Sequence, residues 1–213
     1  MAPSKKSKEQ VLSVMPNHKI VVFHLKGISP LICHRMSGES RDRIIKSLFD
    51  KEPGKRARRG AEEKPDLEYL YLESRYTFGK GKIGISALSI RSALISAARN
   101  TDLTMNQMKQ TVFSLADGVD RRCGTPVIEV VGTPVCLPRV VRTDQGKSVA
   151  SICTMWETWS IKARVEYDAD TISVKTLTEL MHRAGLEVGL GVGRAEAKSG
   201  KGGMNGRFKI SDK

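Results

Sequence analysis

The sequence predicts an α+β fold in which two helices alternate with β-strands. Residues 86–100 and 173–185 place apolar side chains at the spacing of one helical face. Short segments that are β-branched or that alternate apolar with polar residues precede and follow these helices. In chain order we expect a strand at 18–26, a helix at 86–100, strands at 126–132 and 158–167, a helix at 173–185 and a strand at 206–211.

The first half of the chain holds one strong strand signal and one strong helix signal. HKIVVFHLKG (18–27) is an apolar run with few polar interruptions, which predicts a central, buried strand. Residues 40–50 suit a short helix, and 67–78 suit a strand or a short strand pair. In the helix at 86–100, Ser86 is the expected N-cap. Its apolar stripe consists of Leu88, Ile90, Leu94, Ile95 and Ala98.

The middle of the chain predicts one more helix and a hairpin. Thr104 and Gln107 have the spacing of a capping box, so we expect a helix over 104–118 that stops at Gly118. Residues 134–155 read as a hairpin with its tip at 144–146. Pro138 cannot donate a ladder hydrogen bond, which favours an edge position for the first arm.

The last third gives the clearest periodicities. Residues 158–168 alternate, with Trp159, Ile161, Ala163, Val165 and Tyr167 facing a core and Ser160, Lys162, Arg164 and Glu166 facing outward. Ser173 is the expected N-cap of the final helix, and Gly185 fits the C′ position that ends it.

The order of elements, βαββαβ, is that of a ferredoxin-like (RRM-like) core. Such a sheet is antiparallel with both helices on one face, and nucleic acids commonly lie on the free face. We therefore expect a basic arm at 1–17, a single domain at 18–211 and a tail at 212–213. The domain carries insertions at 28–85, 104–125 and 133–157, the last as a protruding β-hairpin thumb.

The charge of the chain points to a polyanionic partner. The 213 residues carry a formal net charge of +13, and like charges repel one another in a compact fold. Nucleic acid is the commonest partner that neutralises such an excess. The alternative is a basic tail together with a solvated surface.

Other classes of function have little support in the sequence. Four cysteines occur without a C-x-x-C pair or finger-spaced histidines, so we expect reduced core thiols, no metal and no cofactor. We see no secretory signal and no membrane span, and we expect a cytoplasmic protein.

The glycine-rich stretch 189–207 is the first candidate binding element. Glycine lets backbone N–H groups approach phosphate closely, and basic side chains add charge. Those side chains are Arg194, Lys198, Lys201 and Arg207. A flexible linker to the last strand is the alternative interpretation.

Further candidates lie outside that stretch. Arg139, Arg142 and Lys147 lie on or near the predicted hairpin, where they either track phosphates or protect an edge strand. Trp156 is a candidate for base stacking, whereas Trp159 falls on the apolar face. The remaining cations are Lys55, Arg56, Arg58 and Arg59 in the polar insertion 51–64, and Lys162 and Arg164 on the outward side of their strand.

Several segments together carry a resemblance to known proteins. They are KGISPL (26–31), WSIKARVEYD (159–168), RAG (183–185) and GLGVGRAEAKSGKGGMNGRFKI (189–210). They resemble phage-encoded proteins of unassigned function, which are similar in turn to the RAMP superfamily of CRISPR backbone subunits. The resemblance implies binding of single-stranded nucleic acid through its backbone and head-to-tail assembly along the strand. The first strand departs from the RNA-recognition pattern because it offers Phe23 and His24 instead of a pair of stacking aromatics.

We therefore expect a non-enzymatic, sequence-nonspecific protein that binds single-stranded DNA or RNA, associates with itself and does not enter membranes. A metal-independent endoribonuclease is one alternative, for which His34 near Lys26 and Arg35 is the candidate catalytic group. Asp117 and Asp120 lie in a predicted turn without obvious partners, which argues against paired carboxylates for metal-ion chemistry. A structural filament or virion assembly protein is the other alternative.

Overall fold

A computed structural model describes residues 17–35, 38, 66–142, 148–196 and 202–212. The helix expected at 40–50 lies outside the described residues, as does nearly all of the N-terminal arm. Within the described part, the α+β class is confirmed, because helices and antiparallel sheets share one hydrophobic core.

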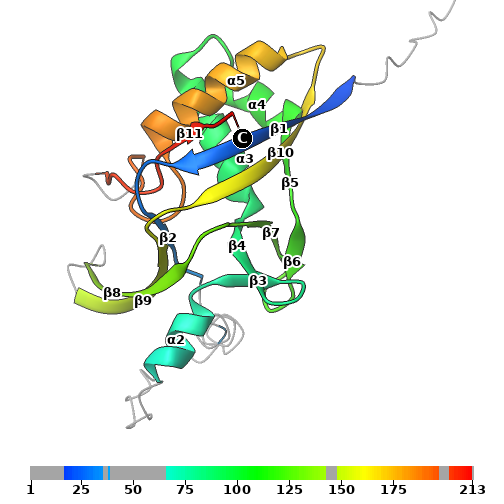
Figure 1. The fold of residues 1–213 in the computed structure, drawn as a ribbon. Coiled ribbons are helices and arrows are strands. Elements are labelled where there is room, and N and C mark those ends of the chain that lie inside the picture. Colours follow the sequence, from blue (N-terminus) through cyan, green and yellow to red (C-terminus); the bar gives the residue numbers. More distant parts are fainter. Residues whose placement is uncertain (1–16, 36–37, 39–65, 143–147, 197–201, 213) are drawn as a thin grey trace, which may run out of the picture.

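A four-stranded sheet forms the upper part of the molecule (Figure 1). Its strand order is β11-β1-β10-β5, and all neighbouring strands are antiparallel. The strands are β1 (His18–Gly27), β5 (Val112–Leu115), β10 (Ser160–Asp168) and β11 (Phe208–Ile210). The expected strands at 18–26, 158–167 and 206–211 therefore all belong to this sheet.

β1 is central, as expected, but the expectation that it is buried on both sides is wrong. Phe23 and Leu25 are buried, whereas Val22 is 41% exposed. The neighbours on the β10 side repeat the pattern, since Ala163 is buried and Lys162 is exposed. The sheet thus packs on one face only, and we call its other side the open face.

Two helices cover the packed face. They are α3 (Ala87–Ala97), extended by a 3₁₀ turn at Ala98–Asn100, and α5 (Val174–Arg183). α3 buries Ile90 and Leu94 against the sheet, and α5 buries Leu177, Leu180 and Met181. Each such side chain contributes about 1.5–3 kcal/mol through burial. The expected stripe of α3 is wrong at Leu88, which is 54% exposed.

Only some of the helix ends have the caps that the sequence predicts. Ser173 caps α5 by accepting a hydrogen bond from the Thr176 amide, as expected, whereas Ser86 makes no side-chain cap bond to α3. Gly185 does not end α5, because the chain continues into a π turn at Ala184–Val188. A Cβ at Gly185 would lie 2.2 Å from the Phe208 carbonyl oxygen, so this glycine permits close packing against β11.

The helix expected at 104–118 is much shorter. α4 spans Met105–Thr111, and the predicted Thr104–Gln107 capping box is present. The chain then becomes extended, and β5 pairs with β10. The buried Val112 and the Arg91 guanidinium, which donates to the carbonyl oxygens of Lys109 and Val112, hold this switch in place.

β5 also replaces the strand expected at 126–132 in the core sheet. The segment expected at 126–132 instead forms β7, which belongs to a separate sheet of order β3-β4-β7-β6. Its strands are β3 (Tyr76–Phe78), β4 (Lys82–Ser86), β6 (Gly118–Asp120) and β7 (Thr125–Glu129). The segment expected as a strand at 67–78 is instead α2 (Leu67–Glu73) followed by β3. The stretch 104–125 therefore supplies a core strand and is not simply an insertion.

The predicted hairpin is present. β8 (Pro134–Arg142) pairs with β9 (Ser148–Trp156) from Pro134 opposite Trp156 to Arg142 opposite Ser148. β9 also pairs with β2 (Leu31–Cys33), so β8 is an edge strand, as Pro138 predicted. The tip at 144–146 lies outside the described residues.

Candidate nucleic-acid interface

The glycine-rich loop, residues 189–207, is a folded element in its described parts, 189–196 and 202–207. Its two arms are joined by hydrogen bonds from the Leu190 amide to the Gly206 carbonyl (2.9 Å) and from the Asn205 amide to the Gly193 carbonyl (3.1 Å). The Val192 amide donates to the Ile32 carbonyl at 2.8 Å and so fixes the loop to β2. The described arms are therefore not a flexible linker.

Backbone packing explains the glycines of this loop. Gly206 has a φ of +69°, and a Cβ there would lie 1.9 Å from the Leu190 carbonyl oxygen. At Gly191, with a φ of +73°, a Cβ would lie 2.2 Å from the Ile32 carbonyl oxygen. Because the amides of Leu190, Val192 and Asn205 already donate to carbonyl groups, they are not available to phosphate. The basic side chains of the loop are therefore its candidate phosphate contacts.

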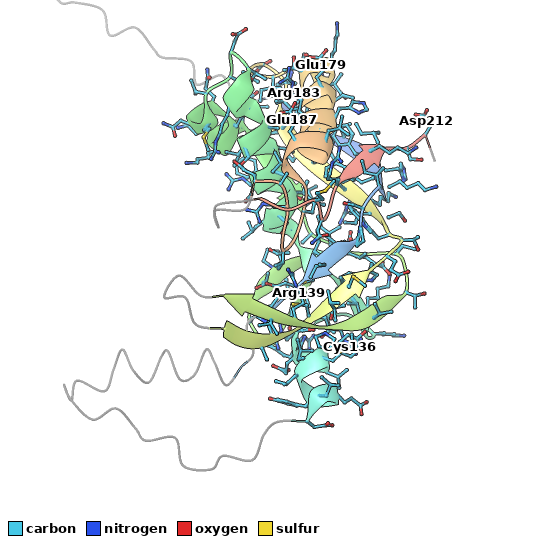
Figure 2. The ribbon with its side chains drawn as sticks, turned by 90° about the vertical axis from the view of Figure 1, so that its left-hand side faces the viewer. Cys136, Arg139, Glu179, Arg183, Glu187 and Asp212 are labelled. Carbon is cyan, nitrogen blue, oxygen red and sulfur yellow. The ribbon has the colours of Figure 1, made fainter. Side chains whose placement is uncertain are left out.

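Arg139 of β8 meets the loop from the hairpin side (Figure 2). Its Nη2 lies 4.0 Å from the position of a Cβ on Gly193. Its Nη1 is buried and has no hydrogen-bond partner among the residues that the structure describes. Arg194 lies on the same loop, where its Nη1 donates to the Gly191 carbonyl at 3.2 Å. We call Arg139, Gly193, Arg194 and Asn205 the junction surface.

The electrostatics of the junction surface favour an anion. Neither Arg139 nor Arg194 forms an ion pair within the described part of the chain. Glu196, the nearby carboxylate of the loop, pairs with Arg99 instead. A guanidinium that no carboxylate of the described residues neutralises attracts anions, and its planar set of N–H donors suits phosphate oxygens.

Among the other cations expected on the loop and hairpin, Arg207 is the one whose side chain the structure describes. Arg207 donates from Nε to the Leu186 carbonyl at 3.2 Å, which places it beside the π turn. Arg142 ends β8 opposite Ser148, and nothing is described of its side chain. Five expected residues of the insertion and hairpin tip, together with two of the loop, lie outside the described residues: Lys55, Arg56, Arg58, Arg59, Lys147, Lys198 and Lys201.

Lys162 and Arg164 lie on the open face, as their alternation predicted. Lys162 is exposed, whereas Arg164 pairs with Asp117, with Nη2 3.0 Å from Oδ1. Sequence reasoning missed Lys26 and Lys209 on this face. Their signal was the alternation of His24 and Lys26 with Phe23 and Leu25, which the apolar character of the run obscured.

The expectation that Trp156 stacks on bases is wrong. Its side chain is fully buried, with 0% exposure, because β9 lies between β2 and β8 and turns this residue into the core. Trp159 is also core, as expected. It donates from Nε1 to the Ser29 carbonyl at 2.8 Å and packs edge-on against Phe208. Neither tryptophan is available to a nucleobase.

His34 borders a cleft of 260 Å³ between α3, the end of β2 and the glycine-rich loop. Tyr76 and Arg194 also line this cleft, together with the hydroxyl-bearing Ser86 at the N-cap position of α3 and Ser89, Ser92 and Ser96 on α3 itself. Desolvation lowers the pKa of His34 from its ordinary value. The imidazole is therefore neutral near pH 7 and can accept a proton.

Asp117 and Asp120 have arginine and amide partners. Asp117 accepts from Arg164 and from the Glu129 amide, and Asp120 accepts from Arg122 and from the Thr77 amide. These carboxylates connect strands. Across the described ranges, no group of three or more His, Cys, Asp or Glu residues is arranged to hold a metal ion.

Comparisons with known proteins add little. No model of a known protein family matches the sequence, and no curated protein matches it. Among solved structures, the chain is similar to Cmr6 from Pyrococcus furiosus, at 8% identity and a TM-score of 0.38, over 92% of this chain and 100% of that one. None of the described helices is long and apolar enough to cross a membrane.

Proposed function

We propose that this protein binds single-stranded nucleic acid through its phosphate backbone, without base specificity and without catalysis. The observation that carries the proposal is the junction surface, where the guanidinium groups of Arg139 and Arg194 both lie against the glycine-rich loop and form no ion pair within the described part of the chain. A guanidinium with unused donors is suited to phosphate oxygens.

Phosphate contacts carry no sequence information, and the aromatic side chains offer few platforms for base stacking. Aromatic residues make up 5% of the chain, and both tryptophans are buried. Stacking on aromatic rings is the usual source of salt-independent affinity for single strands. With both tryptophans buried, the release of counterions from phosphates supplies most of the proposed binding energy.

The proposed scaffold is a ferredoxin-like core. The order β11-β1-β10-β5 inserts β10 between β1 and β5, which is the split βαβ arrangement expected for the sequence of elements β1-α3-β5-β10-α5-β11. On this core the β8–β9 hairpin lies beside the glycine-rich loop, because Arg139 of β8 approaches Gly193. In the proposed arrangement this hairpin is the protruding thumb. Head-to-tail assembly along a strand is part of the proposal.

The test is the salt dependence of binding in a variant of the junction surface. Fluorescence anisotropy with a labelled single-stranded oligonucleotide, DNA and RNA in turn, gives log K against log salt. Because each phosphate contact on a single strand contributes about −0.7 to the slope, R139Q/R194Q should make the slope shallower by roughly 1.4. Affinity at low salt should fall with it.

A control variant separates a local contact from a change in net charge. K109Q/K175Q also removes two charges, from exposed positions on α4 and α5. It should keep the wild-type slope. If both double variants change the slope equally, the effect is one of net charge and the junction surface is not the site. If the wild-type protein binds neither oligonucleotide, the proposed function is lost.

A metal-independent endoribonuclease is a second candidate, and the cleft favours it. His34 and Arg194 line the same cleft, so a neutral imidazole and a guanidinium face one space. The imidazole would accept the proton of a ribose 2′-hydroxyl while the guanidinium stabilises the negative charge that develops on the phosphate.

Cleavage of a labelled RNA without divalent metal tests this candidate. A general base contributes about 10²–10⁴-fold to a rate, so H34A should lose cleavage by that factor while H182A keeps it. His182 is exposed on α5, outside the residues that line the cleft. Equal rates for wild type and H34A would remove the ribonuclease and leave the binding function intact.

A further inference from the structure

Three lysines gather at one end of the open face. The β1–β11 register places Lys26 directly opposite Lys209. The β1–β10 register places Lys26 opposite Ser160 and His24 opposite Lys162, so Lys162 is a diagonal neighbour of Lys26. We call Lys26, Lys162 and Lys209 the open-face cluster. All three side chains are exposed.

The open-face cluster has no role in stability that the structure accounts for. Like charges directly opposite each other on neighbouring strands destabilise a sheet. None of the three lysines forms an ion pair with a carboxylate in the described part of the chain. A pair such as Lys26 and Lys209 therefore works against folding unless an anion lies between them.

The surface is also shaped to receive a ligand. A hollow of 590 Å³ lies over this end of the sheet, lined by His24, Lys26 and Lys162. The hydroxyl-bearing residues Thr158, Ser160 and Ser211 line it as well and can donate to anion oxygens. The hollow thus combines ammonium and hydroxyl donors, a set that suits phosphate groups.

The open face and the junction surface point in different directions. The open face looks toward the viewer in Figure 1, in front of α3 and α5. The 90° turn to Figure 2 brings the glycine-rich loop and Arg139 to the viewer and carries β1, β10 and β11 to the right-hand side. A short oligonucleotide on one surface therefore leaves the other surface free.

We propose that the open face is a second phosphate-binding surface for nucleic acid, so that one chain holds two strand segments at once. The inference rests on the proposed function, because it takes the junction surface as the first site. It adds a bridging activity, in which two strands, or two parts of one strand, are brought together. Local concentration of two segments on one protein accelerates their pairing when they are complementary.

The number of short oligonucleotides bound per chain tests the inference. A probe of about six nucleotides lies near the lower end of the site size of a single-strand-binding domain, so it occupies one surface only. Titration calorimetry at low salt should give two per chain for the wild type. K26Q/K162Q/K209Q should give one, and R139Q/R194Q should also give one. Two oligonucleotides with different dyes should show energy transfer on the wild type and lose it in either variant.

The matched control is K80Q/K109Q/K175Q, which also removes three exposed lysines but leaves the open face intact. It should keep two probes per chain. One probe per chain in the wild type, unchanged in K26Q/K162Q/K209Q and lost in R139Q/R194Q, overturns the second surface and leaves the proposed function standing. No binding by the wild type overturns both. If K26Q/K162Q/K209Q alters the oligomeric state but not the number of probes, the open face contacts another copy of the chain, and the inference is also overturned.

Discussion

At the scale of single residues, Arg122 connects two carboxylates that the fold has largely removed from water. Its guanidinium lies 3.0 Å from Glu73 Oε1 and 3.0 Å from Asp120 Oδ2. Desolvation alone would raise the pKa of Asp120, but hydrogen bonds from the Arg122 side chain and from the amides of Arg122 and Thr77 outweigh it. Desolvation would likewise raise the pKa of Glu73, but the Gly38 amide, Arg35 and Arg122 together lower it.

These lowered pKa values predict a loss of stability in acid. Both carboxyl groups take up protons more readily in the unfolded chain, where their pKa is near 4, than in the folded one. Their contribution is therefore complete above about pH 4.5 and is lost as the pH falls further. Urea unfolding between pH 6 and pH 3 should show this decline. D120N should cost about 1–3 kcal/mol at pH 6, because it removes one charge partner of the partly exposed Arg122 while Glu73 remains, and should decline less steeply.

Asp102 provides the comparison for that experiment. It is exposed and forms no ion pair in the described part of the chain. D102N should match the wild-type stability at pH 6 and its decline in acid. A D120N profile that runs parallel to the wild type would mean that Asp120 does not contribute to the acid sensitivity.

At the scale of elements, the glycine-rich loop shows how a pattern with one meaning in sequence acquires another in three dimensions. Seven glycines between positions 189 and 206 indicated a flexible or phosphate-binding segment. In the fold, Gly191 and Gly206 allow backbone segments to touch, and the loop joins β2 to α5 and β11. The packed backbone of the loop holds Arg194 in place.

The packing of the loop predicts that one added methyl group at Gly206 strongly lowers the free energy of unfolding. Gly206 and Gly79 both have positive φ, at +69° and +54°, but a Cβ at Gly79 would meet nothing within 4 Å. G79A should therefore cost only the backbone strain, about 1–2 kcal/mol. G206A adds a clash with the Leu190 carbonyl oxygen, so we expect a larger loss in the free energy of unfolding, measured by urea titration. Equal losses would show that the loop relaxes around the added methyl group.

At the scale of the whole molecule, the net charge of +13 sets the conditions for self-association. Copies of so basic a chain repel one another at low salt unless a polyanion lies between them. The long edge strand β8 carries Pro134 and Pro138, which cannot donate hydrogen bonds to a neighbouring strand. Assembly along nucleic acid fits these features better than assembly of the protein alone.

This balance predicts assembly that depends on the length of the ligand. Sedimentation velocity with single-stranded oligonucleotides of increasing length should show the number of chains per strand rising in steps, and no assembly without nucleic acid. A single chain per strand at every length would contradict head-to-tail assembly. Filaments that form without nucleic acid would instead favour a structural role.

The amino-acid sequence by itself determined the α+β class, the positions of α3 and α5, the β8–β9 hairpin and the basic character of the surface. These features follow from local rules, because helical and extended backbones impose fixed side-chain periods and because charge is additive along the chain. The outward orientation of Lys162 and the caps at Thr104 and Ser173 belong to the same group.

Only the tertiary structure decided which strand completes the core sheet, which tryptophans are buried and which cations are left unpaired. Each of these depends on residues that are distant in the chain. Arg164 meets Asp117 across 47 positions, whereas Arg139 meets Gly193 and pairs with no carboxylate among the described residues. Burial and charge pairing are properties of the assembled surface, and the periodicity of one segment does not report which other segment will cover it.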